Sequence, residues 1–296
     1  MKRAGIVVAA LAIPVAVVLA LAFGLASCGD DGTAGPTPTE TGTVTASPTV
    51  SPTPSASPTG TMTVSVYLLR GETLGVAHRK VPATQAVATA AMTALLEGPN
   101  AREKAAGLAT TILAGTTLNE VTIEDGTARV DLSGEFASGG GSLSMQARVA
   151  QVVYTLTQFR TVKRVDFWID GGLVETLGGE GLDLSAGQTR ADWEDFLPAI
   201  FVETPAVGDT VRSPLTAQGT AMAFEATFVL EVLDKSGDVI AKKVVMATVG
   251  APERGRFSAR IPFSTGEGRI VLYAYEESMA DGSLLNEVRI PLRTQP

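Results

Sequence analysis

Thiol and imidazole side chains are almost absent from this sequence, which has 296 residues but one Cys and one His. A disulfide framework needs paired cysteines, and a Cys/His zinc cluster needs several such ligands, so both are excluded. A catalytic triad would require a poised Ser beside His78, and the chain has no Gly-x-Ser-x-Gly elbow. We therefore interpret His78 as a surface residue on a β-segment, and we expect no catalytic residue, no metal and no cofactor.

Basic residues are fewer than acidic ones, with 23 Lys and Arg against 31 Asp and Glu, for a formal net charge of −8. A surface of this sign is a poor match for the phosphates of nucleic acids, which attract Lys and Arg. The sequence therefore predicts no nucleic-acid partner.

An apolar segment opens the chain: Met1-Lys2-Arg3 is basic, and residues 4–26 carry no charge. The segment ends in Leu25-Ala26-Ser27-Cys28, which resembles the lipobox of bacterial lipoproteins. The resemblance implies cleavage between Ser27 and Cys28, so that 1–27 is a signal peptide. It further implies acylation of the Cys28 sulfur by chains such as palmitate, and a protein held on the outer face of the cytoplasmic membrane. The alternative is an uncleaved anchor helix, since 23 residues can span a bilayer, but Pro14 argues against it.

The following segment, 28–61, is dominated by Ser, Thr, Pro and Gly, which make up 24 of the 30 residues from 32 to 61. So few apolar residues cannot offset the entropy of ordering the backbone. We expect a disordered tether that separates the folded part from the membrane.

Residues 62–185 are expected to form an α+β domain with the order β-α-β-β-α-β and two helices on one sheet. Residues 143–159 place apolar side chains at helical spacing, and Asp125-Gly126 is typical of a two-residue hairpin turn. Val130-Asp131-Leu132-Ser133, the stretch 153–159 and the stretch 165–171 resemble the GerMN domain of spore-germination and sporulation lipoproteins. The resemblance implies a fold similar to ring-building proteins and a role in envelope scaffolding.

Residues 198–296, after a linker at 186–197, carry seven strand candidates separated by turn signals, a pattern typical of an immunoglobulin-like sandwich. The candidates are 199–203, 215–220, 227–233, 239–247, 256–263, 269–276 and 285–292. Pro205, Gly208, Ser213-Pro214 and Gly219, together with Asp281-Gly282, resemble the immunoglobulin-like domain of bacterial spore-germination proteins. That resemblance implies an extracellular protein-binding module.

Strand alternation places Val165, Phe167 and Ile169 toward a core, so Asp166, Trp168 and Asp170 should face the other way. Exposed aromatic side chains often mark interfaces, and this trio is the candidate interaction surface. The alternative is that Trp168 packs beneath the segment 172–195. Asp166 and Asp170 lie about 13 Å apart along a strand, too far for a glycosidase pair, although Asp131 or Glu135 could pair with either across strands.

These observations favour a lipid-anchored, non-catalytic envelope protein that acts as a scaffold or interaction module. Its expected partners are the membrane, through Cys28, and other envelope proteins, with a homo-oligomer as an open alternative. A competing hypothesis is an accessory ligand-binding or regulatory lipoprotein of a transporter or sensor. A third is a cell-wall hydrolase.

Overall fold

The computed structural model describes residues 60–296, apart from 180, 265, 267 and 296. The expected signal peptide and nearly all of the expected tether therefore lie outside the described residues. The described residues belong to one unit, which contains two large hydrophobic cores, one in each half of the sequence.

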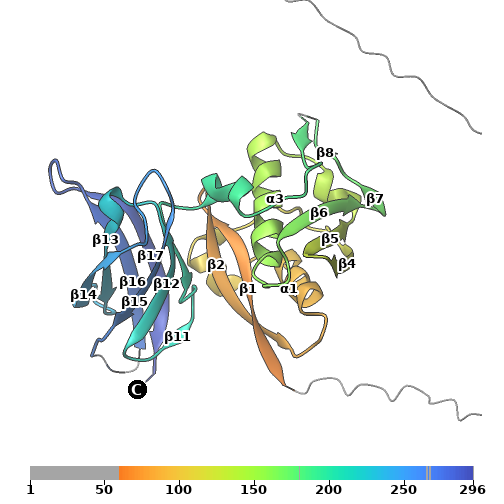
Figure 1. Ribbon diagram of the computed structural model, residues 1–296. Helices are drawn as coiled ribbons and strands as arrows, with labels where there is room; N and C mark the ends of the chain where they lie inside the picture. The colour runs from red at the N-terminus through yellow and green to blue at the C-terminus, as the bar shows by residue number, and fades with distance from the viewer. Residues whose placement is uncertain (1–59, 180, 265, 267, 296) are drawn as a thin grey trace, which may run out of the picture. The chain divides into compact units, whose positions relative to one another are not determined.

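The first half mixes strands and helices (Figure 1), which confirms the predicted α+β class. Its elements are β1 (Thr61–Arg70), β2 (Thr73–Pro82), α1 (Val87–Leu96), α2 (Ala101–Ala105), β3 (Leu108–Ala109), β4 (Leu118–Glu124), β5 (Thr127–Leu132), the 3-10 helix η1 (Gly134–Ala137), α3 (Ser142–Leu156), β6 (Arg164–Ile169), β7 (Gly172–Leu173), β8 (Thr176–Leu177), β9 (Leu182–Asp183) and the 3-10 helix η2 (Ala191–Phe196). The expected hairpin turn joins β4 to β5, and both Asp125 and Gly126 have positive φ.

The main strands of this half form two sheets, which corrects the expectation of a single sheet. One sheet has the order β2-β1-β3 and the other β4-β5-β6-β7. Helices α1 and α3 both contact β1, and they also contact β4 and β6 respectively, so strands cover the helices on two sides (Figure 1). The cause lies in α3, where every residue from Ala147 to Leu156 is buried. A helix buried on all sides needs partners on all sides, and a single sheet would cover only one.

The second half is an all-β sandwich, and each of the seven expected strands is present. Its elements are β10 (Ile200–Thr204), β11 (Thr210–Val211), β12 (Leu215–Ala221), the 3-10 helix η3 (Phe224–Ala226), β13 (Thr227–Leu233), β14 (Val239–Met246), β15 (Gly255–Ile261), β16 (Gly268–Glu277) and β17 (Leu284–Thr294). One sheet has the order β10-β12-β15 and the other β11-β17-β16-β13-β14. The short strand β11, which pairs in parallel with the end of β17, was not expected.

Strand β14 is an edge of the five-stranded sheet, since its only sheet partner is β13. Val239, Val244 and Met246 are all more than half exposed along it. Between them, Lys242 lies 3.3 Å from the carboxylate of Glu231, and Lys243 donates to a backbone carbonyl. The edge therefore combines exposed apolar side chains with two cations.

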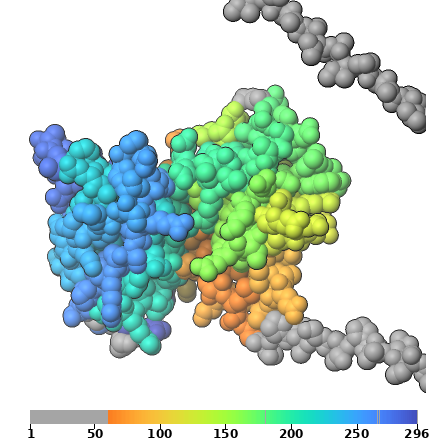
Figure 2. Space-filling view, in the orientation of Figure 1, coloured from red at the N-terminus to blue at the C-terminus, as the bar shows by residue number. Residues whose placement is uncertain are grey.

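The expected linker, 186–197, is part of the first core. Val165 and Gln188 form an isolated antiparallel bridge, and η2 buries Trp193 and Phe196 against the first core. In the space-filling view the residues around 190, coloured green to teal, form a continuous surface with the rest of this half (Figure 2).

Arg148 on α3 organises the glycine-rich loop before that helix. Its side chain is almost completely buried, and its guanidinium donates to the carbonyls of Thr111, Phe136, Ser138 and Gly139 at 2.7–2.8 Å. Burial lowers the pKa of this guanidinium from its ordinary value. The loop at 138–141 is therefore held to the helix by its own backbone carbonyls.

Replacing this arginine in Arg148→Met should lower the free energy of unfolding by about 3 kcal/mol, because several buried carbonyls lose their donor together. Urea unfolding followed by circular dichroism measures the change. The exposed Arg160, which follows α3, provides the control, and Arg160→Met should alter stability by less than about 0.5 kcal/mol. Equal effects of the two substitutions would contradict this role.

Candidate functional site

The predicted interaction surface lies on the outer face of the β4-β5-β6-β7 sheet. Trp168 on β6 is half-buried, with the Arg129 guanidinium 3.6 Å from its ring centroid. Leu173, its register partner on β7, is 54% exposed, and Asp166 shares this face by strand alternation. We call Trp168, Arg129, Leu173 and Asp166 the Trp168 surface.

Asp170 is not part of that surface, because it follows β6 in the tight turn to β7. Its φ is +48°, and Gly171 beside it is also left-handed. Asp131, another carboxylate of the hydrolase hypothesis, is 5% exposed. It accepts hydrogen bonds from the Asn119 amide at 3.2 Å and from the Gly171 N–H at 3.3 Å. Through these contacts Asp131 stabilises the turn between β6 and β7.

The remaining predictions from the sequence have different outcomes. Ser27 and Cys28 lie outside the described residues. His78, expected on a β-segment, lies on β2 with an 18% exposed side chain, and its Nδ1 is 2.7 Å from a carboxylate oxygen of Asp209. Within the described ranges no group of three or more His, Cys, Asp or Glu could hold a metal ion. None of the helices in the same ranges is long and apolar enough to cross a membrane.

A polar network that was not predicted from the sequence joins the two halves of the chain. The Arg190 guanidinium donates to Glu203 on β10 at 2.8 Å and to the Tyr67 hydroxyl on β1 at 2.9 Å. The Tyr67 hydroxyl donates to Glu203 at 2.6 Å, which closes the triangle. Arg190 also donates to the Thr157 hydroxyl just after α3. We call Tyr67, Arg190 and Glu203 the seam triad.

Aromatic rings pack beside the seam triad, in which Tyr67 is buried while the side chains of Arg190 and Glu203 are 32% and 30% exposed. The ring centroids of Tyr67 and Tyr154 are 5.5 Å apart, and Phe201 of β10 packs on both at 6.3 and 6.4 Å. Burial raises the pKa of the Tyr67 hydroxyl well above its ordinary value and raises that of Tyr154 to about 12. Burial alone would lower the pKa of Arg190, but the nearby Tyr67 and Glu203 reverse the direction and raise it. The guanidinium therefore stays charged.

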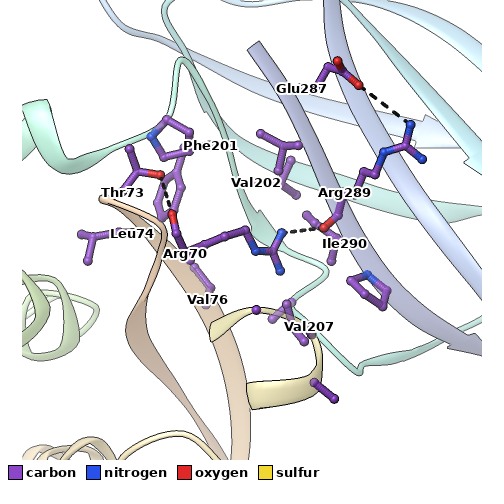
Figure 3. A pocket seen from close by; sticks show the side chains of 18 residues that line it. Arg70, Thr73, Leu74, Val76, Phe201, Val202, Val207, Glu287, Arg289 and Ile290 are labelled. Carbon is purple, nitrogen blue, oxygen red and sulfur yellow. Dashed lines mark hydrogen bonds and ion pairs between the residues drawn. The ribbon is translucent and has the colours of Figure 1, made fainter. Parts of the chain in front are cut away.

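A cavity of about 600 Å³ lies beside this seam, between the β1-β2 hairpin and strands β10 and β17 (Figure 3). Its apolar walls include Leu74, Val76, Phe201, Val202, Val207 and Ile290. Arg70, the last residue of β1, extends toward β17 and donates from Nη1 to the Arg289 carbonyl at 2.5 Å. The Nε and Nη2 groups of Arg70 are buried and have no acceptor among the described residues.

Two family models match the chain, one in each half. Residues 56–175 match Germane, described as "Sporulation and spore germination", and residues 199–283 match Gmad2, described as "Immunoglobulin-like domain of bacterial spore germination". Neither description names an enzymatic reaction. No curated protein matches the chain.

Solved structures with some similarity include chains from Bacillus subtilis and Clostridium perfringens. The tandem GerMN domains of the sporulation protein GerM from Bacillus subtilis are 21% identical, with 69% of this chain and 62% of that chain covered and a TM-score of 0.40. The first GerMN domain of the same protein is 26% identical over 44% of this chain and 99% of that one, with a TM-score of 0.36. A candidate lipoprotein from Clostridium perfringens is 21% identical over 49% and 98%, with a TM-score of 0.34. The chain thus spans less than two thirds of the tandem GerMN structure.

The two matches assign one domain to each half of the described chain, both of kinds described for sporulation or spore germination. Its first half is a GerMN-type domain, and its second half is a Gmad2 immunoglobulin-like domain. Both resemblances drawn from the sequence are thereby confirmed.

Tyr154 gives the seam a testable response to alkaline pH. Its folded-state pKa, about 12, exceeds the ordinary value of 10.0, so folding favours the protonated form. The stability that this proton provides is complete below pH 10.0 and is lost as the pH rises toward 12.

The free energy of unfolding should therefore fall between about pH 10 and about pH 12, and Tyr154→Phe should flatten that fall because it removes a titrating hydroxyl. Urea unfolding at several pH values, followed by tryptophan fluorescence, measures the slope. An unchanged slope in Tyr154→Phe would count against the assignment.

Proposed function

We propose that this chain is a lipid-anchored, non-catalytic envelope protein whose two domains together form a scaffold for other envelope proteins. Its sporulation-related class comes from the two domain matches. The seam triad carries the scaffold part of the proposal, because a charged and aromatic junction between domains favours one fixed arrangement. A fixed pair of domains presents its surfaces at constant spacing, as a scaffold requires.

The lipobox-like sequence Leu25-Ala26-Ser27-Cys28 supports the anchor. Two or three acyl chains on one cysteine give durable membrane attachment, whereas a single chain is marginal. The anchor would hold the protein on the outer face of the cytoplasmic membrane.

The Cys28→Ser variant tests the anchor. The wild-type protein, purified from native membranes, should have the intact mass of residues 28–296 plus fatty acyl groups and should partition into detergent. Cys28→Ser should keep residues 1–27 and carry no acyl group, because the thiol is the acylated atom. An unprocessed wild-type mass without fatty acids would remove the anchor from the proposal.

The Trp168 surface is the proposed contact with a partner protein. Its half-buried tryptophan and exposed Leu173 combine an aromatic anchor with an apolar neighbour, and Arg129 and Asp166 supply a polar rim. This composition is typical of interface centres, where Trp and Arg are enriched.

A photo-cross-linking amino acid at Leu173 should give cross-linked protein products in native membranes, and Trp168→Ala should reduce their yield at least about fivefold. Leu143 is the matched control in the same domain, since the exposed fractions of the two leucines are 54% and 53%. A probe at Leu143 should give no such product. Equal yields from both positions, or no product from Leu173, would contradict the contact. A product with twice the mass of the chain would identify the partner as a second copy.

A further inference from the structure

Exposed apolar side chains gather at one end of the immunoglobulin-like sandwich. Strands β13 and β16 are antiparallel, so the start of β13, which directly follows η3, lies beside the end of β16. Thr227 at the start of β13 pairs with Met246 at the end of β14, and Glu277 pairs with Leu284 across the β16–β17 hairpin, which projects from the sandwich in Figure 1. Six of the twelve large apolar side chains that are exposed in the described part of the chain belong to this end, and we call them the apolar end: Met222, Phe224, Met246, Met279, Leu284 and Leu285. Single exposed apolar residues are normal, whereas a group of them marks an interaction surface.

The turn η3 presents one of these side chains on an unusual backbone. Phe224 is 62% exposed, and the two residues after it, Glu225 and Ala226, have φ values of +51° and +60°. Residues with a Cβ rarely adopt this left-handed conformation, and two in succession persist only where the surrounding structure enforces them.

Contacts from β16, β17 and the loop between β14 and β15 enforce this turn. The buried carboxylate of Glu276 accepts a hydrogen bond from the Phe224 N–H at 2.8 Å and another from the Asn286 amide at 2.6 Å. Gly250 approaches so closely that a Cβ on it would lie 2.5 Å from the Ala226 nitrogen. The backbone that carries the exposed Phe224 ring is therefore fixed before any partner arrives.

The apolar end carries an excess of negative charge. The segments that form it, 221–227, 246–254 and 276–286, contain five acidic residues and one basic residue, Arg254. Arg254 donates to two backbone carbonyls between the domains, and Lys242 of β14 offsets Glu277 at 3.4 Å. The exposed acidic residues are Glu225, Glu253, Glu277 and Asp281.

These charges discriminate between the surfaces that fit an apolar patch. A two-fold contact with a second copy pairs identical surfaces, so it would bring the same acidic residues together. The anionic headgroups of a lipid leaflet would likewise be repelled. A protein segment that carries Lys or Arg beside its apolar side chains matches both the apolar side chains and the charge.

We propose that the apolar end binds a basic amphipathic segment of another protein. The Phe224 ring is the apolar anchor, and Glu225 and Asp281 attract the Lys or Arg side chains of the partner. Three of the six apolar residues are methionines, whose unbranched side chains adapt to the shape of a partner. This site lies in the second domain, so it is a contact additional to the Trp168 surface of the first.

Fluorescence anisotropy of a labelled peptide tests the proposal on residues 60–296, which belong to one unit and contain both hydrophobic cores. The probe peptide repeats Leu-Lys-Lys-Leu-Leu-Lys-Leu twice, which places leucines on one face of a helix and lysines on the other. The control peptide has Glu in place of every Lys. We expect the lysine peptide to bind at least about tenfold more tightly than the glutamate peptide.

Two apolar variants locate the site. Phe224→Ser should weaken binding of the lysine peptide at least about tenfold, because it removes the anchor. Met279→Ser, in the hairpin and outside the η3 turn, should weaken it at least about threefold. Leu143→Ser is the matched control, since it replaces a 53% exposed leucine of the first domain, and it should leave binding unchanged. Trp168→Ala should also leave it unchanged, which separates this site from the Trp168 surface.

Charge variants test the acidic residues. Glu225→Gln combined with Asp281→Asn should weaken binding of the lysine peptide at least about fivefold and reduce its dependence on salt concentration. Glu72→Gln, which removes an exposed acidic residue between β1 and β2, is the control and should have no effect.

Photo-cross-linking in native membranes distinguishes the three possible occupants on the full chain. With benzoylphenylalanine in place of Phe224, we expect a product with a second protein, cross-linked through a segment that contains both apolar residues and Lys or Arg. A product with the added mass of one phospholipid, a product with twice the mass of the chain, a cross-linked segment without Lys or Arg, or no protein product would overturn the proposal. It is also overturned if neither peptide binds, if both bind equally, or if Phe224→Ser binds the lysine peptide as well as the parent does.

Discussion

Hydrogen bonds from one side chain, that of Arg190, connect the two domains at several points. Its guanidinium reaches β1 through Tyr67, the end of α3 through Thr157 and β10 through Glu203. Each acceptor belongs to a different element, so displacing any one element breaks at least one of these part-buried hydrogen bonds. Phe201 packs on Tyr67 and Tyr154 and also lines the adjacent cavity. Arg190, which lies in the segment predicted from the sequence to be a linker, thus contacts both domains and helps to hold them together.

The local sequence pattern was sufficient to predict most individual helices and strands. Alternation along β6 correctly separated Phe167 from Trp168, and Asp125-Gly126 correctly located a hairpin, because both signals depend on neighbours in the sequence. The strands of the sandwich were also found, since each is bounded by turn residues. For the same reason, the GerMN resemblance could be read from short stretches such as 153–159 and 165–171.

Features that depend on distant residues could not be predicted in this way. The helical pattern of α3 revealed one apolar face, but the buried Ala147, Ala150 and Tyr154 lie on the opposite side, and this is why a second sheet was missed. Tyr67 and Glu203 are separated by 136 residues, so no spacing rule connects them. The sequence did contain two signals of polar contacts between the domains: Glu203 and Arg70 each lie at the end of an apolar strand. A charged residue next to a buried apolar segment usually has a polar partner.

The edge strand β14 has a consequence for the proposed anchor, which would concentrate the protein on a membrane surface. Open strand edges with apolar side chains can pair with another copy and begin aggregation, and many proteins prevent this with lysines at the edge. Lys242 and Lys243 stand in the middle of β14, between Val239 on one side and Val244 and Met246 on the other. Two such edges brought together would oppose their cations and repel each other. The lysines would therefore disfavour pairing between the β14 edges of neighbouring molecules at high local density.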